Sequence, residues 1–500
     1  MKGRAFNKKW LRGLLLMGIF ATLLWKINSF GWLAINFVDE QDNLVVGSYV
    51  TEGAKIYDKV FTHHQPASYL ISAGIQRISK ANTIQSLVKQ HRMVVSIWSI
   101  AWLVFLGLRF GPGLAMGMMI FELVKKLYLG NMFLAESLTV APVIYLVLVF
   151  IKGTNSKLES VFIGLMFALV GLLLAPMWPL VGILGLGWLI RWRKDVPRIA
   201  GMVISALSVV VASSFFVDIG DYIKEAILIN KEYYIKIAGG DNMVVSLVKS
   251  VLTPFEYLVE APRSAEAGVI KVMVLLFIIG TLYLLKKKNY KEAALIWILV
   301  SLSNLRNFEL EKIYYDGFHL IIWVGLIISM AMFLLSKKKK MVWIGVLPII
   351  FLLITNLNLL REKANYEEDF EIYYSRIFNM SETIRRTREE GDRLLSMPDQ
   401  TLAYWKTGVE PAGRFIFFYK WMSGVEELRE EQMDNFRSKP EYMIIKSDEG
   451  LKIGEFLTEY QKFQYREDEG ASEFYIRKDF FENMSDEKKE IVKYYGLKEI

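Results

Sequence analysis

The chain has 500 residues, of which 53% are hydrophobic and 22% are charged. This composition is too apolar for an ordinary soluble protein and indicates several membrane spans. The absence of cysteine excludes disulfides, thiolate metal sites and cysteine nucleophiles from this chain. The formal net charge is +8, but no basic stripe interleaved with aromatic residues marks a soluble nucleic-acid interface, so we expect no nucleic-acid partner.

The chain begins with a basic segment followed by an apolar run from about Leu11 to Phe37. The run is long enough to cross a bilayer and lacks a small-residue cleavage site. We therefore expect a retained first membrane span rather than a cleaved signal peptide.

Clusters of lysine and arginine indicate the membrane topology, because such clusters favour the cytoplasmic side of a membrane. The clusters are Lys2–Arg12, Arg109, Lys152–Lys157, Arg191–Arg198, Lys286–Lys291 and Lys337–Lys340. If each is cytoplasmic, about eleven apolar runs must cross the bilayer, with the N-terminus inside. After Leu11–Phe37 these runs are Met93–Leu108, Pro112–Leu129, Leu138–Ile151, Leu158–Leu174, Leu180–Ile190, Ile199–Val217, Ile270–Leu285, Ala293–Leu305, Leu320–Leu335 and Met341–Leu360.

Two segments between these runs are predicted to lie on the external side. In the first, residues 38–92, the stretch Ala67–His91 is only weakly apolar and favours an amphipathic helix on the membrane surface. The second, residues 217–267, is predicted to form interfacial helices that break at Gly239-Gly240 and at Pro254. This second segment suits a packing lid at least as well as a substrate loop.

The chain becomes charged and soluble in character after Leu360, and residues 362–500 are predicted to form a small extracytoplasmic α/β domain. The expected fold is thus an all-α polytopic membrane bundle over residues 1–361 with this domain at its C-terminal end. The expected strands are Leu402–Trp405, Phe415–Tyr419, Tyr442–Ile445 and Phe474–Ile476, and the expected helices are Glu362–Leu395, Val425–Phe436 and Leu451–Phe463.

The most informative stretch follows the first predicted span. Three carboxylates, Asp39, Glu40 and Asp42, follow directly after that span. Ionisable groups at this position are energetically costly unless they are solvated or functional. Farther along come Gly53, Tyr57-Asp58 and the segment His63-His64-Gln65-Pro66. A solvated cap at a helix end is the alternative interpretation of the carboxylates.

This order of residues resembles the first external loop of the GT-C glycosyltransferases, which use polyprenyl-phosphate sugars. The family includes the protein O-mannosyltransferases and the aminoarabinose transferases of lipid A. It commonly shows an acidic pair, then G-x-x-Y-x-D, then H-P-P, whereas this chain has only Pro66 at the last position. That departure leaves the subfamily open. Tyr404-Trp405, Pro411, Arg414-Phe415 and Pro440-Glu441-Tyr442 resemble the terminal domains of bacterial relatives in the same group.

The resemblance implies a multi-pass enzyme of the plasma or inner membrane that transfers a sugar on its external face. The donor would be a polyprenyl-phosphate sugar, and the acceptor a lipid, a glycan or a protein. Asp39 matches the first acidic position and is the implied general base; Glu40 is either the base or its orienting neighbour. One base and no second nucleophile imply inversion at the anomeric carbon.

Further polar residues are predicted on the same side, including all four histidines of the chain. Arg92, Arg306, Lys125 and Lys126 are candidates to stabilise a departing phosphate, although the two lysines could instead extend to the interface. His319 suits a helix cap equally well. The predicted substrate-binding set is Tyr57, His63, His64, Gln65, Arg92, Glu136, Arg306 and His319.

A divalent metal, Mg²⁺, Mn²⁺ or Zn²⁺, is left open as a cofactor. Asp39, Glu136, His64 and His319 are ligands of the required type, but no HExxH-like spacing is present. The alternative function is a polytopic transporter or lipid flippase, which would place polar groups near mid-bilayer in repeated halves. A non-catalytic scaffold is a third interpretation, and it leaves the acidic stretch unexplained.

Overall fold

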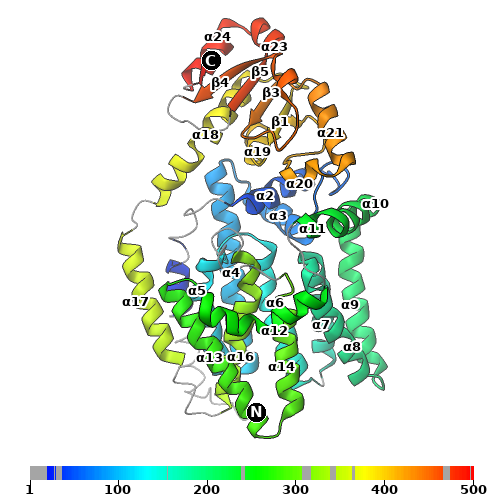
Figure 1. The fold of residues 1–500 in the computed structure, drawn as a ribbon, viewed down its shortest axis with the longest axis vertical. Coiled ribbons are helices and arrows are strands. Elements are labelled where there is room, and N and C mark those ends of the chain that lie inside the picture. The colour runs from blue at the N-terminus through cyan, green and yellow to red at the C-terminus, as the bar shows by residue number, and fades with distance from the viewer. Residues whose placement is uncertain are drawn as a thin grey trace, which may run out of the picture. The chain divides into compact units, whose positions relative to one another are not determined.

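The computed structural model describes most of the chain as helical, with one small sheet (Figure 1). The described residues are 18, 20–27, 29, 37–154, 156–237, 243–306, 317–337, 345–362, 366–465, 473–495 and 497–499. Much of the predicted first span, the predicted break at Gly239-Gly240 and the lysines at 338–340 lie outside these residues.

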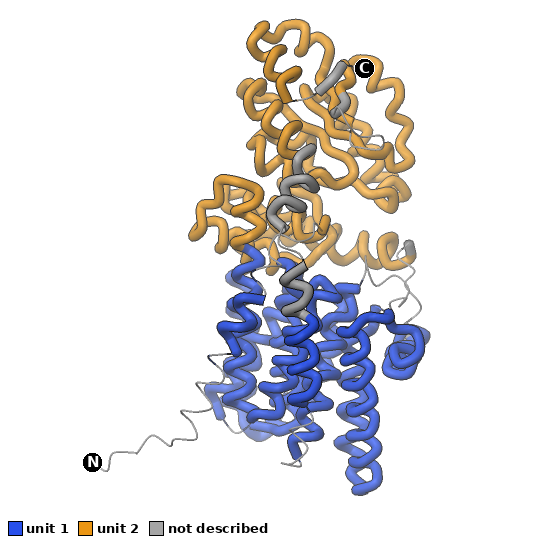
Figure 2. Tube along the Cα trace, turned by 90° about the vertical axis from the view of Figure 1, so that its left-hand side faces the viewer, with its two compact units in different colours: residues 1–32, 91–212, 240–366 blue, residues 33–90, 213–239, 367–500 orange. Residues whose placement is uncertain are grey.

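The chain divides into two compact units, which Figure 2 shows in two colours. Unit 1 comprises residues 1–32, 91–212 and 240–366, and unit 2 comprises residues 33–90, 213–239 and 367–500. Unit 2 therefore joins the C-terminal segment with most of the first predicted external segment and part of the second. The predicted division at residue 361 separates membrane-spanning from extracytoplasmic residues, whereas the two units are defined by their compactness.

Unit 1 is built from apolar helices. Within the described parts of the chain, five helical segments are long and apolar enough to cross a membrane: Ile84–Phe110 (α4, which begins in unit 2), Ala135–Lys152 (α6), Val196–Ser214 (α9), Ala265–Lys286 (α13) and Gly317–Ser336 (η5 with α16, Ile321–Ser336). The other helices are α5 (Pro112–Val124), η1 (Lys125–Tyr128), α7 (Lys157–Leu173), η2 (Ala175–Met177), α8 (Trp178–Arg191), α12 (Met243–Glu260), α14 (Tyr290–Leu302) and α17 (Val346–Glu362). A mostly helical architecture with several apolar helices of membrane-spanning length is thus observed, and the count of eleven spans stays a prediction.

Small residues let the helices of unit 1 approach closely, as is usual for helices in a bilayer. A Cβ atom on Gly164 of α7 would lie 2.0 Å from the carbonyl oxygen of Met202 on α9. Ser205, one turn farther along α9, donates a hydrogen bond to the Val161 carbonyl at 2.8 Å. The α7–α9 contact therefore depends on the missing side chain at residue 164.

Unit 2 contains a six-stranded mixed sheet in the order β2-β1-β3-β5-β4-β6. Strand β1 pairs in parallel with β2 and β3, whereas the β3–β5, β4–β5 and β4–β6 pairs are antiparallel. The strands are Arg393–Met397, Glu410–Pro411, Tyr442–Ile445, Tyr460–Tyr465, Glu473–Arg477 and Leu497–Glu499. The helices are α2 (Val38–Thr51), α3 (Ala67–Ser79), α10 (Ile219–Tyr222), the π-helix η3 (Ile223–Tyr234), α11 (Ile235–Ile237), α18 (Tyr366–Thr387, which begins in unit 1), α19 (Leu402–Thr407), α20 (Lys420–Ser423), α21 (Glu426–Arg437), α22 (Gly454–Leu457), α23 (Lys478–Asn483) and α24 (Asp486–Tyr494).

Two predictions about the external segments are wrong. The stretch 67–91 is not one helix, because α3 ends at Ser79 and Lys80 adopts a left-handed backbone conformation, with φ of 49°. Thr83 and Ser86 then cap each other's backbone N–H groups and start α4 at Ile84. Pro254 also fails to end a helix, because it lies inside α12.

The predicted secondary structure of residues 362–500 is correct in part. The strands at Tyr442–Ile445 and Phe474–Ile476 are confirmed in β3 and β5, and the helix near Val425–Phe436 is confirmed as α21. Leu402–Trp405 is wrong as a strand, since it lies in α19, and Phe415–Tyr419 forms no strand. Leu451–Phe463 is wrong as a helix, because only Gly454–Leu457 is helical before β4 begins.

Candidate functional site

The carboxylates after the first predicted span lie on a helix and not in a loop. Asp39 and Glu40 occupy the first turn of α2, where unpaired backbone N–H groups favour negative charge. Glu40 is 1% exposed, whereas Asp39 is only partly buried. Asp39 is therefore the more accessible carboxylate at this helix end.

Asp42 lies nearly one turn after Asp39 and is fully buried, at 1% exposure. Its Oδ1 atom has no hydrogen-bond partner within the described part of the chain, and its Oδ2 atom is 3.5 Å from the hydroxyl of Tyr419. Burial raises the pKa of Asp42 well above its ordinary value, and the negative charges of Asp39 and Asp399 add to the rise. Thr401 and Tyr419 oppose that rise by hydrogen bonding.

This acidic cluster, formed by Asp39, Asp42 and Asp399, places carboxyl groups in two different environments. The buried Asp42 favours its protonated form, whereas Asp39 is only partly buried at the helix start, where negative charge is favoured. Two carboxyl groups whose environments separate their protonation states are suited to acid and base roles.

Asp42 was within reach of sequence reasoning, since residues three apart share a helix face. Asp399 and Tyr419 carried no such signal, because they lie more than 350 residues away.

The segment that contains the predicted His-Gln-Pro motif is held by hydrogen bonds from two tyrosines, Tyr57 and Tyr222. The hydroxyl of Tyr57, a fully buried residue, donates to the His64 carbonyl at 2.6 Å. Gln65 accepts a hydrogen bond from Tyr222 at 2.9 Å. Tyr57 and Gln65 thus have structural contacts, but the Gln65 Nε2 atom is buried without a hydrogen-bond partner in the described part of the chain.

His63 is 6% exposed and is enclosed by aromatic rings. Its ring centroid is 4.0 Å from that of His64, 4.8 Å from Tyr234 and 5.2 Å from Trp421. His64 is less buried than His63 and is the histidine of the pair that a ligand can reach more easily.

An ion-pair group that the sequence did not reveal fixes the same segment. The side chain of Glu225, on the π-helix η3, is fully buried; it accepts a hydrogen bond from the Thr62 backbone at 3.1 Å and pairs with Arg414. Arg414 also binds Glu431 through two hydrogen bonds of 2.6 and 2.9 Å. Burial raises the pKa of the Glu225 carboxyl and the Arg414 charge opposes the rise. This group ties η3 and α21 to the chain beside His63.

Unit 1 has a separate polar cluster that consists of Glu136, Arg306 and His319. Arg306 donates to Glu136 at 2.9 Å, and the His319 Nδ1 atom is 3.6 Å from the same carboxylate. Arg306 also contacts His319 directly at 2.5 Å. Three predicted site residues from distant parts of the sequence are therefore brought together. Arg92, a fourth candidate, is fully buried on α4.

Lys125 does not extend to an interface, so that interpretation is wrong for this residue. Its side chain is 1% exposed and lies 2.7 Å from Glu122, which is also fully buried. Its ammonium group also donates to Ser99 at 3.1 Å. Lys126 is only partly buried.

The four candidate metal ligands are divided between the two units. Asp39 and His64 belong to unit 2, and Glu136 and His319 belong to unit 1. The described residues include no group of three or more His, Asp or Glu side chains arranged to hold a metal ion. A cation between Glu136 and His319 would also have to displace the guanidinium of Arg306, so these residues fit a metal poorly.

Comparison with known proteins adds no family assignment. No protein-family model matches the chain, and no curated protein matches it. The resemblance to the GT-C glycosyltransferases therefore rests on the short motifs named above, and the predicted site residues stay predictions.

Proposed function

We propose that the chain is a membrane glycosyltransferase of the GT-C type, which transfers a sugar from a polyprenyl-phosphate donor to an acceptor outside the cytoplasm. The observation that carries the proposal is the pair of carboxyl groups at the start of α2, one accessible and one buried. The five membrane-length helices support it, because the donor is itself a lipid. The cell membrane, the external location of unit 2 and the full set of about eleven spans belong to this proposal.

Asp39 acts as the general base in the proposed reaction. An acceptor hydroxyl attacks the anomeric carbon, its proton passes to Asp39, and the bond from that carbon to the phosphate oxygen breaks. The electron pair of that bond leaves with the polyprenyl phosphate. Asp42, which favours the protonated form, adds no second negative charge beside Asp39 and can donate a hydrogen bond.

Arg306 is the proposed cation for the donor phosphate. A guanidinium can bind two phosphate oxygens at once, and Glu136 and His319 hold this one in place. Arg306 is 27% exposed, so part of its hydrogen-bonding capacity is accessible to a ligand.

The proposal is tested by reconstituting the protein in liposomes with a panel of polyprenyl-phosphate hexoses and pentoses and lipid or glycan acceptors. Mass spectrometry of the products is expected to detect a glycosylated acceptor with the wild type and not with Asp39→Asn. The matched control is Asp434→Asn, an exposed aspartate on α21. Retained transfer by Asp39→Asn would reject the base assignment.

One observation favours the alternative function, a transporter or lipid flippase. The Glu122–Lys125 pair is fully buried among apolar helices of unit 1, and such pairs often mark ion or substrate pathways. If the wild type transfers no sugar from any donor but moves labelled polyprenyl phosphates across liposome membranes, this alternative replaces the transferase.

A further inference from the structure

A large cavity lies within unit 1, far along the helices from the Glu136–Arg306–His319 cluster. Its volume is about 1010 Å³, and it lies where α4, α6 and α8 end and α7 and α9 begin. These ends carry three of the basic clusters that the sequence predicts to be cytoplasmic. Figure 1 shows α7, α8 and α9 in the same part of the molecule.

The lining changes from aromatic to basic along α4 and α6. On α4, Phe105 lines the cavity four residues before Arg109, a separation of about 6 Å along the axis. On α6, Tyr145 lies two turns before Lys152. The rings of Phe105, Tyr145 and Phe162 contact one another with centroids 5.0 to 5.7 Å apart. The cavity thus has an aromatic inner wall and a charged rim.

The rim has an excess of positive charge. Four cations line the cavity, Arg109, Lys152, Arg191 and Arg198, against the single carboxylate of Glu159. Two of the cations are neutralised, because Arg109 binds Glu159 at 2.8 Å and Arg198 pairs with Asp195.

The other two cations, Lys152 and Arg191, contact no carboxylate among the described residues. Their closest polar contacts are backbone carbonyls, Phe110 for Lys152 and Phe150 for Arg191. The Arg191 guanidinium also lies over the rings of Phe150 and Trp188, 4.8 and 4.9 Å from their centroids. Two cations held at fixed positions on one rim are suited to bind an anion.

The surroundings of the cavity distinguish a lipid from a soluble anion. Leu158, which lines the cavity, is 80% exposed. Ile190, next to Arg191 in the sequence, and Val196, two residues before Arg198, are 70% and 69% exposed. Large apolar side chains this exposed are expected where a helix faces hydrocarbon rather than water. A ligand at this rim therefore has access to an apolar phase.

We infer that the cavity is a binding site for an anionic phospholipid. The phosphate group binds between Lys152 and Arg191, and an acyl chain lies along Phe105, Phe162 and Leu165. The phosphate chemistry is shared with free phosphate, but the exposed apolar rim and the aromatic wall fit the lipid. This site is separate from the proposed transfer chemistry and does not depend on it.

The test is native mass spectrometry of the full chain, released from detergent after incubation with phosphatidylglycerol or phosphatidylcholine. We expect the wild type to retain one phosphatidylglycerol in clear excess over phosphatidylcholine. Lys152→Gln/Arg191→Gln is expected to reduce that retention, by about fivefold for each cation removed. The charge-conserving variant Lys152→Arg/Arg191→Lys is expected to keep it.

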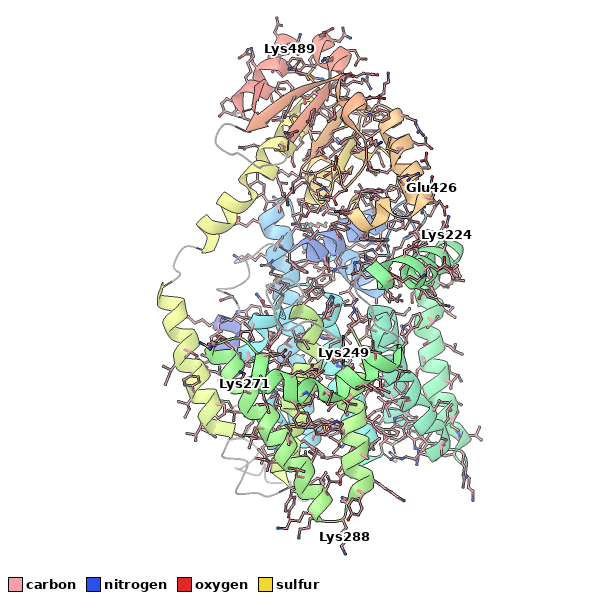
Figure 3. All side chains as sticks on the ribbon, in the orientation of Figure 1. Lys224, Lys249, Lys271, Lys288, Glu426 and Lys489 are labelled. Atoms are coloured by element: carbon pink, nitrogen blue, oxygen red, sulfur yellow. The ribbon has the colours of Figure 1, made fainter. Side chains whose placement is uncertain are left out.

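The matched control is Lys286→Gln/Lys288→Gln, which removes two exposed cations at the end of α13. Figure 3 labels Lys288 at the turn after α13, where its side chain points away from the helices. Leu165→Trp keeps every charge but fills the apolar part of the cavity, so it is expected to lower lipid retention. This variant tests the inference independently if the glutamine variant does not fold.

Three results would overturn the inference. They are equal retention of the two lipids by the wild type, unchanged phosphatidylglycerol retention in both the glutamine and the tryptophan variants, and displacement of the lipid by millimolar inorganic phosphate. The last result would assign the rim to a soluble anion.

Discussion

Unit 1 and the acidic cluster of unit 2 surround their buried carboxyl groups in opposite ways. In unit 1, buried carboxylates have cationic partners, with Glu136 beside Arg306 and Glu122 beside Lys125. In unit 2, the acidic cluster brings carboxyl groups of the same sign together, and Asp42 lacks a cationic partner among the described residues. A cationic partner favours the charged form of a carboxylate, whereas burial and neighbouring carboxylates favour the protonated form.

This difference assigns different chemical tasks to the two units. Fixed opposite charges suit the binding of a phosphate, since a guanidinium held by a carboxylate and an imidazole needs little reorganisation. A protonated carboxyl beside an accessible carboxylate suits proton transfer. Glu225 shows that unit 2 can also form ion pairs, because Arg414 joins it to Glu431. The acidic cluster is therefore a local feature of α2 and its neighbours.

The largest expected effect on activity comes from replacing Arg306. Arg306→Gln is expected to lower sugar transfer by about 10²-fold, because it removes the cation proposed for the leaving phosphate and leaves Glu136 uncompensated. Arg306→Lys should retain part of the activity, since a lysine keeps the charge but not the paired hydrogen bonds. Initial rates in liposomes measure both.

The control is Arg263→Gln, an exposed arginine between α12 and α13. If Arg306 only stabilises the fold, the loss of melting temperature will account for the loss of rate, and the apparent KM for the donor will not change.

The close approach of helices in unit 1 gives the next largest effect. Gly164→Ala is expected to destabilise the protein by about 1–3 kcal/mol, because its Cβ would meet the Met202 carbonyl. Gly268→Ala on α13 is the matched control, since nothing lies within 4 Å of its Cβ position. Thermal unfolding in detergent compares the two, and equal melting temperatures would show that α7 and α9 tolerate separation.

The smallest effect is a pH dependence of stability in unit 2. The pKa of Asp42 is raised in the folded state, so the folded chain binds more protons than the unfolded chain above about pH 4. Stability is therefore expected to fall as pH rises from this value towards the raised pKa. Asp42→Asn removes this dependence. The lost contribution to the free energy of unfolding is at most ~1.4 kcal/mol per pH unit.

Melting curves of the wild type and Asp42→Asn between pH 5 and pH 8 measure that change. The variant should gain stability relative to the wild type as the pH rises. A constant difference would mean that Asp42 titrates normally when folded.

Hydropathy and basic clusters predicted most helices of unit 1, because long apolar runs between lysine and arginine clusters have few alternatives. The ends were less accurate. Helix α4 begins nine residues before the predicted Met93, since Thr83 and Ser86 start it while the first two turns are still polar. Side-chain capping determined where the helix begins. The apolar content of the sequence did not predict that position.

The sheet of unit 2 was predicted less well. Strands β3 and β5 were found from runs of β-branched and aromatic residues, but Leu402–Trp405 has a similar composition and is helical. The hydroxyl of Tyr404 accepts a hydrogen bond from the backbone N–H of Ser396 at 2.9 Å, a tertiary contact that the sequence does not reveal.

The candidate site shows the same limit. The acidic stretch was found because carboxylates beside an apolar run are unusual, and Glu136, Arg306 and His319 were each found singly. Their contact with one another, and that of Asp42 with Tyr419, joins residues up to 377 positions apart. Such contacts depend on the fold and leave no local pattern.

The most direct test compares sugar transfer by Asp39→Asn, Asp42→Asn and Asp434→Asn under identical conditions. If Asp39 is the base, Asp39→Asn should lose about 10²–10⁴-fold in rate. Asp42→Asn should stay within about tenfold of the wild type, because asparagine resembles the neutral carboxyl that burial already favours. Asp434→Asn should have no effect. Full activity in Asp39→Asn, or an equal loss in the Asp39 and Asp42 variants, would contradict the separation of roles between the two carboxyl groups.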